Sequence, residues 1–413
     1  MVSLREFKNI PIDAFYDVDS DNQLMMFLKA TAVKTLLDVD AHFAKSQLLT
    51  KGVNDVTEID CICEKEMLPI KENIYSRVYK KFSDCQFRHY DAAIIYGRNN
   101  LDFMTTFSAL EGMTDTVITF ARYESDFEKY LAANVNFFES VNFVPSFAGR
   151  WFICRRHTQP KEFAMYVVTH KALPPEHIEK LPAGYKVIHA GRAISADLGY
   201  LGDNTGDNIS QLNPYLSEFT ALYWMFKNTN HSVVGFSHYR RFFTESEEKP
   251  FTEINDDNFS HNKILTLEAA ESLLKDCDII VTRLAQHYTT QFEDIKDCDG
   301  LDLVKLVEVT MKKNLTVLYP EYDKFFDYVI NSPTYYECSM FVMRKHCFQN
   351  YCEWLFSFVL DTFKEVSKQV PLEKLQGFPR RSVSHFIERM FTVWLIKNKL
   401  RIKEINKMFV HGI

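Results

Sequence analysis

The sequence contains no long hydrophobic run and no pair of cysteines at metal-binding spacing. Its apolar runs, such as residues 91–96 and 277–281, have the length of strands and fall far short of the roughly 20 residues that a membrane-spanning helix needs. The nine cysteines include no C-x-x-C pair, so we expect reduced, mostly buried thiols and no zinc or redox centre. Because no continuous apolar segment of the secretory type occurs at the N-terminus, we expect a cytoplasmic protein.

Excess positive charge is also missing over the chain as a whole. The net charge of −7 argues against a general nucleic-acid-binding protein. Locally the balance is reversed, because residues 378–408 hold eight Lys or Arg against Glu388 and Glu404, a surplus of six. One interpretation of this basic region is a solvated helix face. The other is peripheral contact with anionic lipid at the inner face of the inner membrane, at about 1 kcal/mol for each basic residue near the surface.

What is present is the pattern of an α/β protein with two domains. The length of 413 residues and a hydrophobic content of 46% support more than one core. Short strand-like runs alternate with helical stretches, which predicts largely parallel sheets. We place a Rossmann-like domain at residues 1–160 and a second α/β domain at residues 161–413. The runs that predict strands are residues 34–40, 56–60, 90–96, 116–120, 163–169 and 186–190, with a helix at 41–49 and a closing hairpin at 143–155.

The order of strands in the first domain resembles the class I methyltransferase sheet. In that family an LDVGCG-type turn after the first strand holds the cofactor, and an acidic residue ends the second strand. Here residues 37–43 read LDVDAHF, and without glycines the backbone cannot approach a cofactor closely. Asp60 does stand where the acidic residue would. We therefore expect a degenerate methyltransferase-like domain that binds no S-adenosylmethionine.

A loop rich in Gly, Asp and Asn opens the part of the chain that carries the candidate chemistry. Its polar side chains are Asp203, Asn204, Asp207 and Asn208. They precede a predicted helix for which Asn213 is a candidate N-cap, with an apolar stripe at residues 216, 219, 223 and 226. A polar loop before a helix N-terminus is suited to a sugar or a nucleotide.

A His-Tyr-Arg-Arg box follows the predicted strand at residues 232–237. Ligands bind at the C-terminal edge of strands in open α/β sheets, so we expect at least one arginine to point into a cleft. The forks of Arg240 and Arg241 match phosphate oxygens and could neutralise a departing nucleotide diphosphate. His238 is a candidate metal ligand or phosphate donor, and a structural role for it is equally open.

Residues 162–413 resemble a family of bacterial capsular and exopolysaccharide biosynthesis proteins that is related to nucleotide-sugar glycosyltransferases of the GT-A fold. The resemblance rests on residues 202–210, 213–228 and 235–243, with later matches at 335–336, 340–343, 351–356 and 386–389. It implies transfer of a hexose, of galactose or galactofuranose type, from a nucleotide diphosphate sugar that we expect to be UDP-linked. The implied acceptor is a glycan or lipid-linked glycan of a capsule or O-antigen.

The resemblance also implies roles for individual residues. The donor would be bound by Asp203, Asn204, Asp207, Asn208, His238, Tyr239, Arg240 and Arg241. The box stands where many GT-A enzymes keep an Asp-x-Asp metal motif, which is absent at this place. A divalent cation, Mn²⁺ or Mg²⁺, held by His238 and Asp203 therefore stays an open alternative to arginines that do the cation's work.

Glu388 is the candidate catalytic base, together with Asp207 and Arg240 as catalytic residues. It lies on a predicted helix at residues 382–397, and an exposed glutamate beside Arg389 is the alternative interpretation. An inverting transferase needs a carboxylate or imidazole near the acceptor hydroxyl. Asp203, Asp207 and His287 are rival candidates for this role.

Two other functions stay open at this level. One is a bifunctional methyltransferase and glycosyltransferase, which would require S-adenosylmethionine to bind the first domain. The other is a non-catalytic scaffold of a polysaccharide assembly complex.

Overall fold

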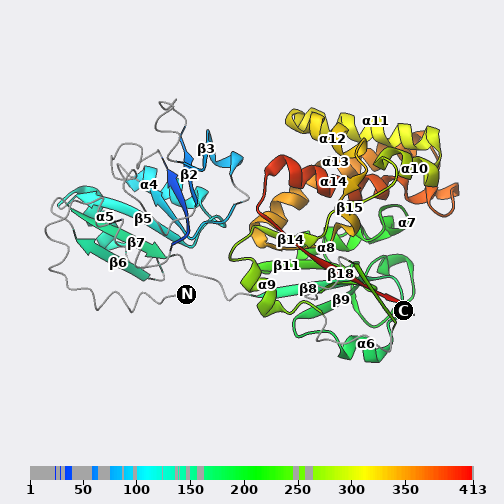
Figure 1. Ribbon diagram of the computed structural model, residues 1–413, viewed down its shortest axis with the longest axis horizontal. Helices are drawn as coiled ribbons and strands as arrows, with labels where there is room; N and C mark the ends of the chain where they lie inside the picture. The colour runs from blue at the N-terminus through cyan, green and yellow to red at the C-terminus, as the bar shows by residue number, and fades with distance from the viewer. Residues whose placement is uncertain are drawn as a thin grey trace. The chain divides into compact units, whose positions relative to one another are not determined.

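The computed structural model describes residues 24, 28, 33–39, 58–63, 75–85, 88–95, 100–122, 124–134, 138, 140–145, 149–155, 162–244, 251–255 and 264–411. The chain forms two compact units, unit 1 at residues 1–159 and unit 2 at residues 160–413. Each unit contains its own β-sheet (Figure 1). Among the described residues, no helix combines the length and the hydropathy needed to cross a membrane.

Unit 1 is built on a seven-stranded sheet with the order β3-β2-β1-β4-β5-β7-β6. The pairs from β3 to β5 are parallel, and β7 is antiparallel to both β5 and β6. The helices α4 and α5 follow β4 and β5. The bounds are β1 Thr35–Val39, β2 Glu58–Ile62, β3 Arg77–Tyr79, β4 Ala92–Ile95, α4 Asn100–Ala109, β5 Thr116–Arg122, α5 Asp126–Ala133, β6 Ser140–Pro145 and β7 Gly149–Arg155.

Apolar runs explain the centre of this sheet. The four residues of β4 are all buried, as expected of a parallel strand that is covered on both faces. Asp60 in β2 is also fully buried, and it accepts hydrogen bonds from the hydroxyl of Tyr90 at 2.8 Å and from the guanidinium of Arg88 at 2.7 Å. The carboxylate at this position is thus bound to protein side chains.

Unit 2 contains a larger mixed sheet that runs β10-β9-β8-β11-β12-β18-β14-β17, with an additional β11–β17 pairing and with β13 paired to β18. The strands β8 to β11 are parallel, whereas β12 and β17 are antiparallel to their neighbours. The bounds are β8 Phe163–Thr169, β9 Tyr185–His189, β10 Leu201–Gly202, β11 Val233–His238, β12 Arg241–Thr244, β13 Phe251–Asn255, β14 Ile279–Thr282, β17 Phe341–Arg344 and β18 Ile402–His411, with the small pair β15 Ala285–Gln286 and β16 Thr334–Tyr335.

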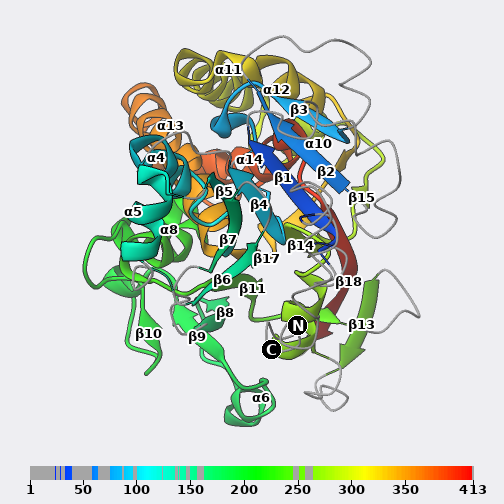
Figure 2. The same ribbon diagram turned by 90° about the vertical axis from the view of Figure 1, so that its left-hand side faces the viewer.

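The helices of unit 2 are unevenly distributed about this sheet. In both views α10 to α14 gather on one side of it, and α6 lies at the opposite end (Figures 1 and 2). The bounds are α6 Pro175–Glu179, α7 Asn213–Leu216, α8 Phe219–Asn228, α9 Leu267–Leu273, α10 Gln291–Asp299, α11 Leu301–Leu318, α12 Asp323–Ile330, α13 Lys345–Gln369 and α14 Ser382–Asn398; the short helices η11 Glu337–Ser339 and η13 Pro379–Arg381 are used below.

The predicted α/β class with parallel strands is confirmed, and most predicted strands lie within two residues of the observed ones. The helix predicted at residues 41–49 lies outside the described residues. One prediction in unit 2 is wrong, because the single helix after Asn213 is broken. Ser217 has φ 51° and ψ −136°, which ends α7 and lets α8 start in a new direction. Asn213 is the first residue of α7, and its amide donates to the carbonyl of Ser217 at 2.8 Å.

Candidate functional site

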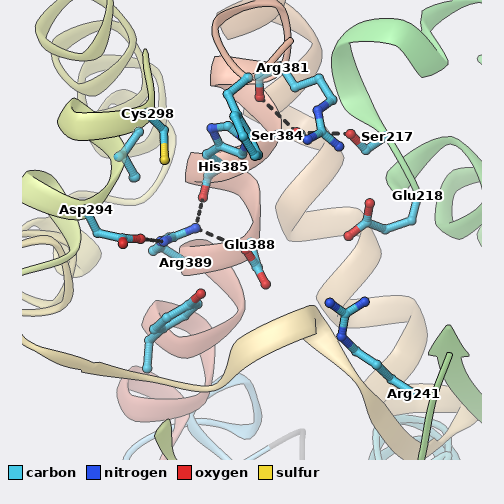
Figure 3. A pocket seen from close by; sticks show the side chains of 13 residues that line it. Ser217, Glu218, Arg241, Asp294, Cys298, Arg381, Ser384, His385, Glu388 and Arg389 are labelled. Carbon is cyan, nitrogen blue, oxygen red and sulfur yellow. Dashed lines mark hydrogen bonds and ion pairs between the residues drawn. The ribbon is translucent and has the colours of Figure 1, made fainter. Parts of the chain in front are cut away.

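A polar pocket of about 320 Å³ lies in unit 2. That volume is at the lower end of the roughly 300–1,000 Å³ that small-molecule sites occupy. Figure 3 shows the side chains that line it. They come from the α7–α8 break, the start of β12, α10, β16, and the segment from η13 into α14. Segments far apart in the chain therefore meet at this pocket.

The His-Tyr-Arg-Arg box forms a tight turn between β11 and β12. His238 pairs with Arg241, so that Tyr239 and Arg240 occupy the two turn positions. Arg241, as the first residue of β12, lines the pocket. Arg240 does not line it, and its guanidinium lies 5.0 Å from the ring centre of Tyr239 and 5.3 Å from that of Phe409. The guanidinium of Arg241 also lies 5.3 Å from the ring centre of Phe409, but of the two arginines only Arg241 lines the pocket.

Helical spacing brings the next set of side chains together. Arg381, His385 and Glu388 are separated by four and three residues around the start of α14, and such positions share one face of a helix. All three line the pocket. The Nδ1 of His385 lies 2.9 Å from Oδ2 of the buried Asp299, which fixes the orientation of the imidazole ring.

The arginines of the pocket fall into two kinds. Arg389 is buried and held by Asp294 at 2.7 Å and by Glu388 at 3.0 Å. Arg241 and Arg381 have no ion pair with a carboxylate of the described residues, and both line the pocket. In Figure 3 their guanidinium groups lie above and below the carboxylate of Glu218. Two guanidinium groups are therefore available to an anionic ligand.

Glu388 is fixed by neighbours on both of its oxygens. Oε1 accepts a hydrogen bond from the backbone N–H of Cys338 at 2.5 Å, and Oε2 accepts one from Arg389 at 3.0 Å. Cys338 lies in η11 with φ 66°, a backbone conformation that non-glycine residues rarely adopt. The carboxylate of Glu388 therefore secures a strained loop at the edge of the pocket.

His238 supports the same loop from the other side. Its Nε2–H donates to the carbonyl of Cys338 at 2.7 Å, and the side chain is buried. Burial lowers the pKa of His238 to about 4, aided by the positive charge of Arg241, although the hydrogen bond to Cys338 acts in the opposite direction. His238 is thus neutral at pH 7, and its Nε2 is already engaged.

Glu218 is a lining residue that the sequence analysis did not select. It is the N-cap of α8 and directly follows the strained Ser217. Figure 3 shows its carboxylate directed into the pocket between Arg381 and Arg241. Burial raises the pKa of Glu218, while its own backbone N–H and the charges of Arg381 and Arg241 act in the opposite direction.

Asp203 is buried beneath the backbone turn that follows β9. Its carboxylate accepts four hydrogen bonds: from the N–H groups of Gly191 at 2.9 Å and Arg192 at 3.0 Å, and from the hydroxyls of Ser210 at 2.5 Å and Thr220 at 2.7 Å. Both carboxylate oxygens are therefore used within the protein, and Asp203 does not line the pocket.

The rest of the polar loop folds against α8. Asp207 accepts a hydrogen bond from the hydroxyl of Tyr223 at 3.1 Å, Asn208 accepts one from the backbone of Ser210 at 3.2 Å, and Asn204 is exposed. None of these loop residues lines the pocket. Of the predicted site residues, the structure brings Arg241 and Glu388 together, and it places the polar loop elsewhere.

The two residues considered for a metal do not suit that role. Nε2 of His238 donates to a carbonyl, and the oxygens of Asp203 accept hydrogen bonds from four donors. Within the part of the chain that the structure describes, no three His, Cys, Asp or Glu side chains gather in a way that could hold a metal ion. The rival base His287 lies 3.0 Å from Glu337 and does not line the pocket.

Neither Arg381 nor Glu218 was selected for the site from the sequence, and only Arg381 has a signal in it. Arg381 belongs to the basic stretch, and its spacing to His385 and Glu388 is a readable helical signal. Glu218 carried no such signal, because its direction depends on the break at Ser217, which the apolar stripe of residues 216, 219, 223 and 226 conceals.

Comparison with protein families gives one match within unit 2. Residues 164–399, more than half of the 413 residues, match the family described as a domain of unknown function, DUF4422. Among curated proteins nothing matches.

Solved structures similar to the chain include a glycosyltransferase and proteins with methyltransferase domains. The apo structure of WbbM, a bifunctional glycosyltransferase, is 28% identical with a TM-score of 0.52, over 61% of this chain and 46% of the WbbM chain. The chain thus spans just under half the length of WbbM. The methyltransferase domain of a bacterial CtHen1 is 14% identical with a TM-score of 0.25, over 33% of this chain and 98% of its own. A human methyltransferase 10 domain-containing protein is 8% identical with a TM-score of 0.25, over 34% of this chain and 84% of its own.

Proposed function

Because the chain belongs to the DUF4422 family and is similar in structure to a glycosyltransferase, we propose that unit 2 transfers a hexose from a nucleotide diphosphate sugar to a glycan. The proposed donor is UDP-linked, with a sugar of galactose or galactofuranose type. The proposed acceptor is a glycan, or a lipid-linked glycan, of a capsule or O-antigen, and the proposed fold of unit 2 is GT-A-like.

The observation that carries this proposal is the pair of guanidinium groups, Arg241 and Arg381, in a pocket that also holds carboxylates. A departing diphosphate gains negative charge as the glycosidic bond breaks, and preorganised cations stabilise that charge. The helix α14 begins directly after Arg381, so the positive end of its dipole lies beside this side chain. The arginines thus supply the positive charge in a mechanism that includes no metal step.

The polar loop and the turn of the box act at a distance from this pocket. Asp203 fixes the turn at Gly191 and Arg192, and His238 fixes the loop at Cys338. Tyr239 and Arg240 lie at the turn, and Asn204, Asp207 and Asn208 lie on the loop. We propose that these five residues contact the nucleotide part of the donor, outside the pocket.

We further propose that the basic region, residues 378–408, contacts the inner membrane. Arg389, Arg401 and Lys407 are already paired, with Asp294, Asp278 and Glu337 in that order. Exposed Lys399 and Lys403 are left as candidates for binding anionic lipid. The protein would then act in the cytoplasm, at the inner face of the membrane.

For unit 1 we propose a methyltransferase-like scaffold without a cofactor. The parallel strands β3 to β5 and the closing antiparallel hairpin support the comparison with the methyltransferase sheet. Arg88 and Tyr90 donate hydrogen bonds to the carboxylate of Asp60, which supports the proposal that no cofactor binds there.

The test of the main proposal uses the full chain and a panel of UDP-hexoses. We expect a rise in unfolding temperature with UDP and hydrolysis or transfer of at least one donor. Arg241→Ala and Arg381→Ala should each lower kcat about a hundred-fold, the scale of losing one preorganised charge contact in an active site. The matched control is Lys364→Ala, which removes an exposed cation of α13 outside the pocket. No turnover of any donor, together with no thermal shift by UDP, would refute the proposal.

A further inference from the structure

We propose that Glu218 is the general base of the transfer and that Glu388 is a positioning residue. This assignment rests on the proposed glycosyltransferase function and changes the role that sequence reasoning gives to Glu388. Three carboxylates line the pocket, those of Glu218, Asp294 and Glu388. Asp294 is paired with the buried Arg389 at 2.7 Å, and hydrogen bonds distinguish the other two.

Glu388 is committed to the protein. Its two oxygens accept hydrogen bonds from Cys338 and from Arg389, and Arg389 in turn is held by Asp294. With both oxygens already engaged by donors of the protein, the Glu388 carboxylate is poorly placed to accept a proton from an acceptor hydroxyl. Glu388 therefore holds the loop at Cys338 and the side chain of Arg389 in place.

Glu218 has no such partner. Among the described residues no side chain donates a hydrogen bond to its carboxylate, which is directed into the pocket (Figure 3). Its backbone is fixed as the N-cap of α8, whose next residues Phe219 and Thr220 are buried. Burial favours the protonated form of Glu218, which makes its carboxylate a stronger base than an exposed glutamate.

The position of Glu218 also fits the course of the reaction. The guanidinium groups of Arg241 and Arg381 flank its carboxylate. Because a single displacement needs the base on the face of the anomeric carbon opposite to the departing diphosphate, the diphosphate is proposed to bind these guanidinium groups on the side that faces away from Glu218. An oxygen of Glu218 takes the proton of the acceptor hydroxyl, and the hydroxyl oxygen forms a bond to the anomeric carbon. The bond from that carbon to the diphosphate oxygen breaks, and its electron pair leaves with the nucleoside diphosphate. A single displacement of this kind inverts the anomeric carbon.

His385 is the other titratable group in this pocket that could act as a base. Its Nδ1 is engaged by Asp299, and its ring packs against the exposed Phe378, with ring centres 6.0 Å apart. His385 thus lies beside the exposed side chain of Phe378, whereas Glu218 lies between the two guanidinium groups. The geometry favours Glu218 for the reacting centre.

The experiment measures donor hydrolysis by the full chain with the UDP-hexose that the wild type turns over fastest. Glu218→Gln should lower kcat by about 10²–10⁴-fold, the range for losing a general base, with little change in KM. The acidic limb of the pH profile of kcat should disappear. Glu388→Gln should keep that limb even where its kcat falls. Glu353→Gln, an exposed glutamate of α13, is the matched control.

Azide gives a readout that a structural role cannot produce. Azide is an anionic nucleophile with no proton to lose, so it reacts without a base. Added to Glu218→Ala, it should restore donor consumption and yield the glycosyl azide of inverted configuration. If Glu218→Ala is unstable, Glu218→Asp is used, and its pH limb should shift while UDP still raises the unfolding temperature.

Each result decides the assignment. A retained acidic limb in Glu218→Gln, its loss in His385→Asn, an azide product of retained configuration, or no azide product would overturn it. If the wild type turns over donor and the Glu218 variants behave as the wild type does, the base assignment alone fails. If the wild type neither binds UDP nor turns over a donor, the proposed function fails as well.

Discussion

His238 belongs to the His-Tyr-Arg-Arg box, but its side chain holds the backbone of another loop in place. It is buried, neutral and hydrogen-bonded to the carbonyl of Cys338, whose N–H in turn binds Glu388. The box therefore connects a strand end to the loop beside the pocket, and of its four residues only Arg241 lines the pocket.

The first prediction concerns the pH dependence of stability. Burial lowers the pKa of His238 to about 4, below its unfolded value of about 6.5. Between these two pH values the unfolded chain binds more protons, so the stabilisation present above pH 6.5 is lost as the pH falls. The loss attributable to His238 is about 3 kcal/mol at roughly 1.4 kcal/mol per pH unit.

Urea unfolding of wild type and His238→Gln at pH 7 and pH 5 checks this prediction. The wild type should lose more free energy of unfolding between the two pH values than the variant does. Equal losses would show that folding does not lower the pKa of His238.

Arg241 and Glu388 could be predicted from the sequence because a strand end and a helix face can be read from local patterns. Arg240 was predicted equally well by charge, but it stands in the turn with its guanidinium 5.0 Å from the ring centre of Tyr239, and it does not line the pocket. Glu218 could not be predicted, because a change of chain direction at Ser217 depends on tertiary contacts. The pairing of Arg241 with Arg381 spans 140 positions, which no local pattern reports.

At the scale of elements, the apolar runs of the sequence predicted the strands well. The same kind of pattern predicted one continuous helix where the structure has a break between α7 and α8. The break concentrates strain in one residue, since Ser217 has φ 51° and ψ −136°. Non-glycine residues in such conformations cost about 1–3 kcal/mol. The strain is maintained by the amide of Asn213 and by the contact of the Ser217 hydroxyl with Ser384 at 3.2 Å.

The second prediction compares two substitutions that both remove the hydroxyl. Ser217→Gly should be more stable than Ser217→Ala by about 1 kcal/mol, because only glycine adopts this conformation freely. Chemical denaturation of the two variants measures the difference. Equal stability would mean that the backbone at Ser217 relaxes at little cost.

The third prediction concerns the basic region. If it contacts anionic lipid, Lys399→Gln with Lys403→Gln should weaken binding to phosphatidylglycerol vesicles by about 2 kcal/mol, or roughly thirty-fold, at about 1 kcal/mol for each lysine. The double variant Lys313→Gln with Lys364→Gln, on α11 and α13, is the control. If the Lys399 and Lys403 variant floats with the vesicles as the wild type does, the proposed membrane contact through this region is wrong. A truncation before this region is unsuitable, because it would also delete α14 and β18.

At the scale of the whole molecule, the chain pairs a unit that holds the candidate site with a unit whose role is proposed to be structural. Every residue that lines the pocket belongs to unit 2. In unit 1 the polar groups at the strand ends bind one another, as when the hydroxyl of Tyr75 donates to Asp38 at 2.6 Å.

The fourth prediction follows for S-adenosylmethionine. Calorimetry of the full chain should detect no binding, because residues 37–43 include no glycine and Asp60 already accepts hydrogen bonds from Arg88 and Tyr90. Binding in the micromolar range would instead favour a bifunctional methyltransferase and glycosyltransferase.

The position of β18 has a consequence for how the protein is made. This strand pairs with β12 on one side and with β14 on the other, although it lies at the C-terminal end of the described chain. The strand β13 also pairs with it. During translation these partners present open edges until β18 has left the ribosome, and open edges invite association with other chains. Nascent chains that stall shortly before Ile402 should therefore depend heavily on chaperones, and a nonsense mutation at that point should prevent unit 2 from completing its sheet.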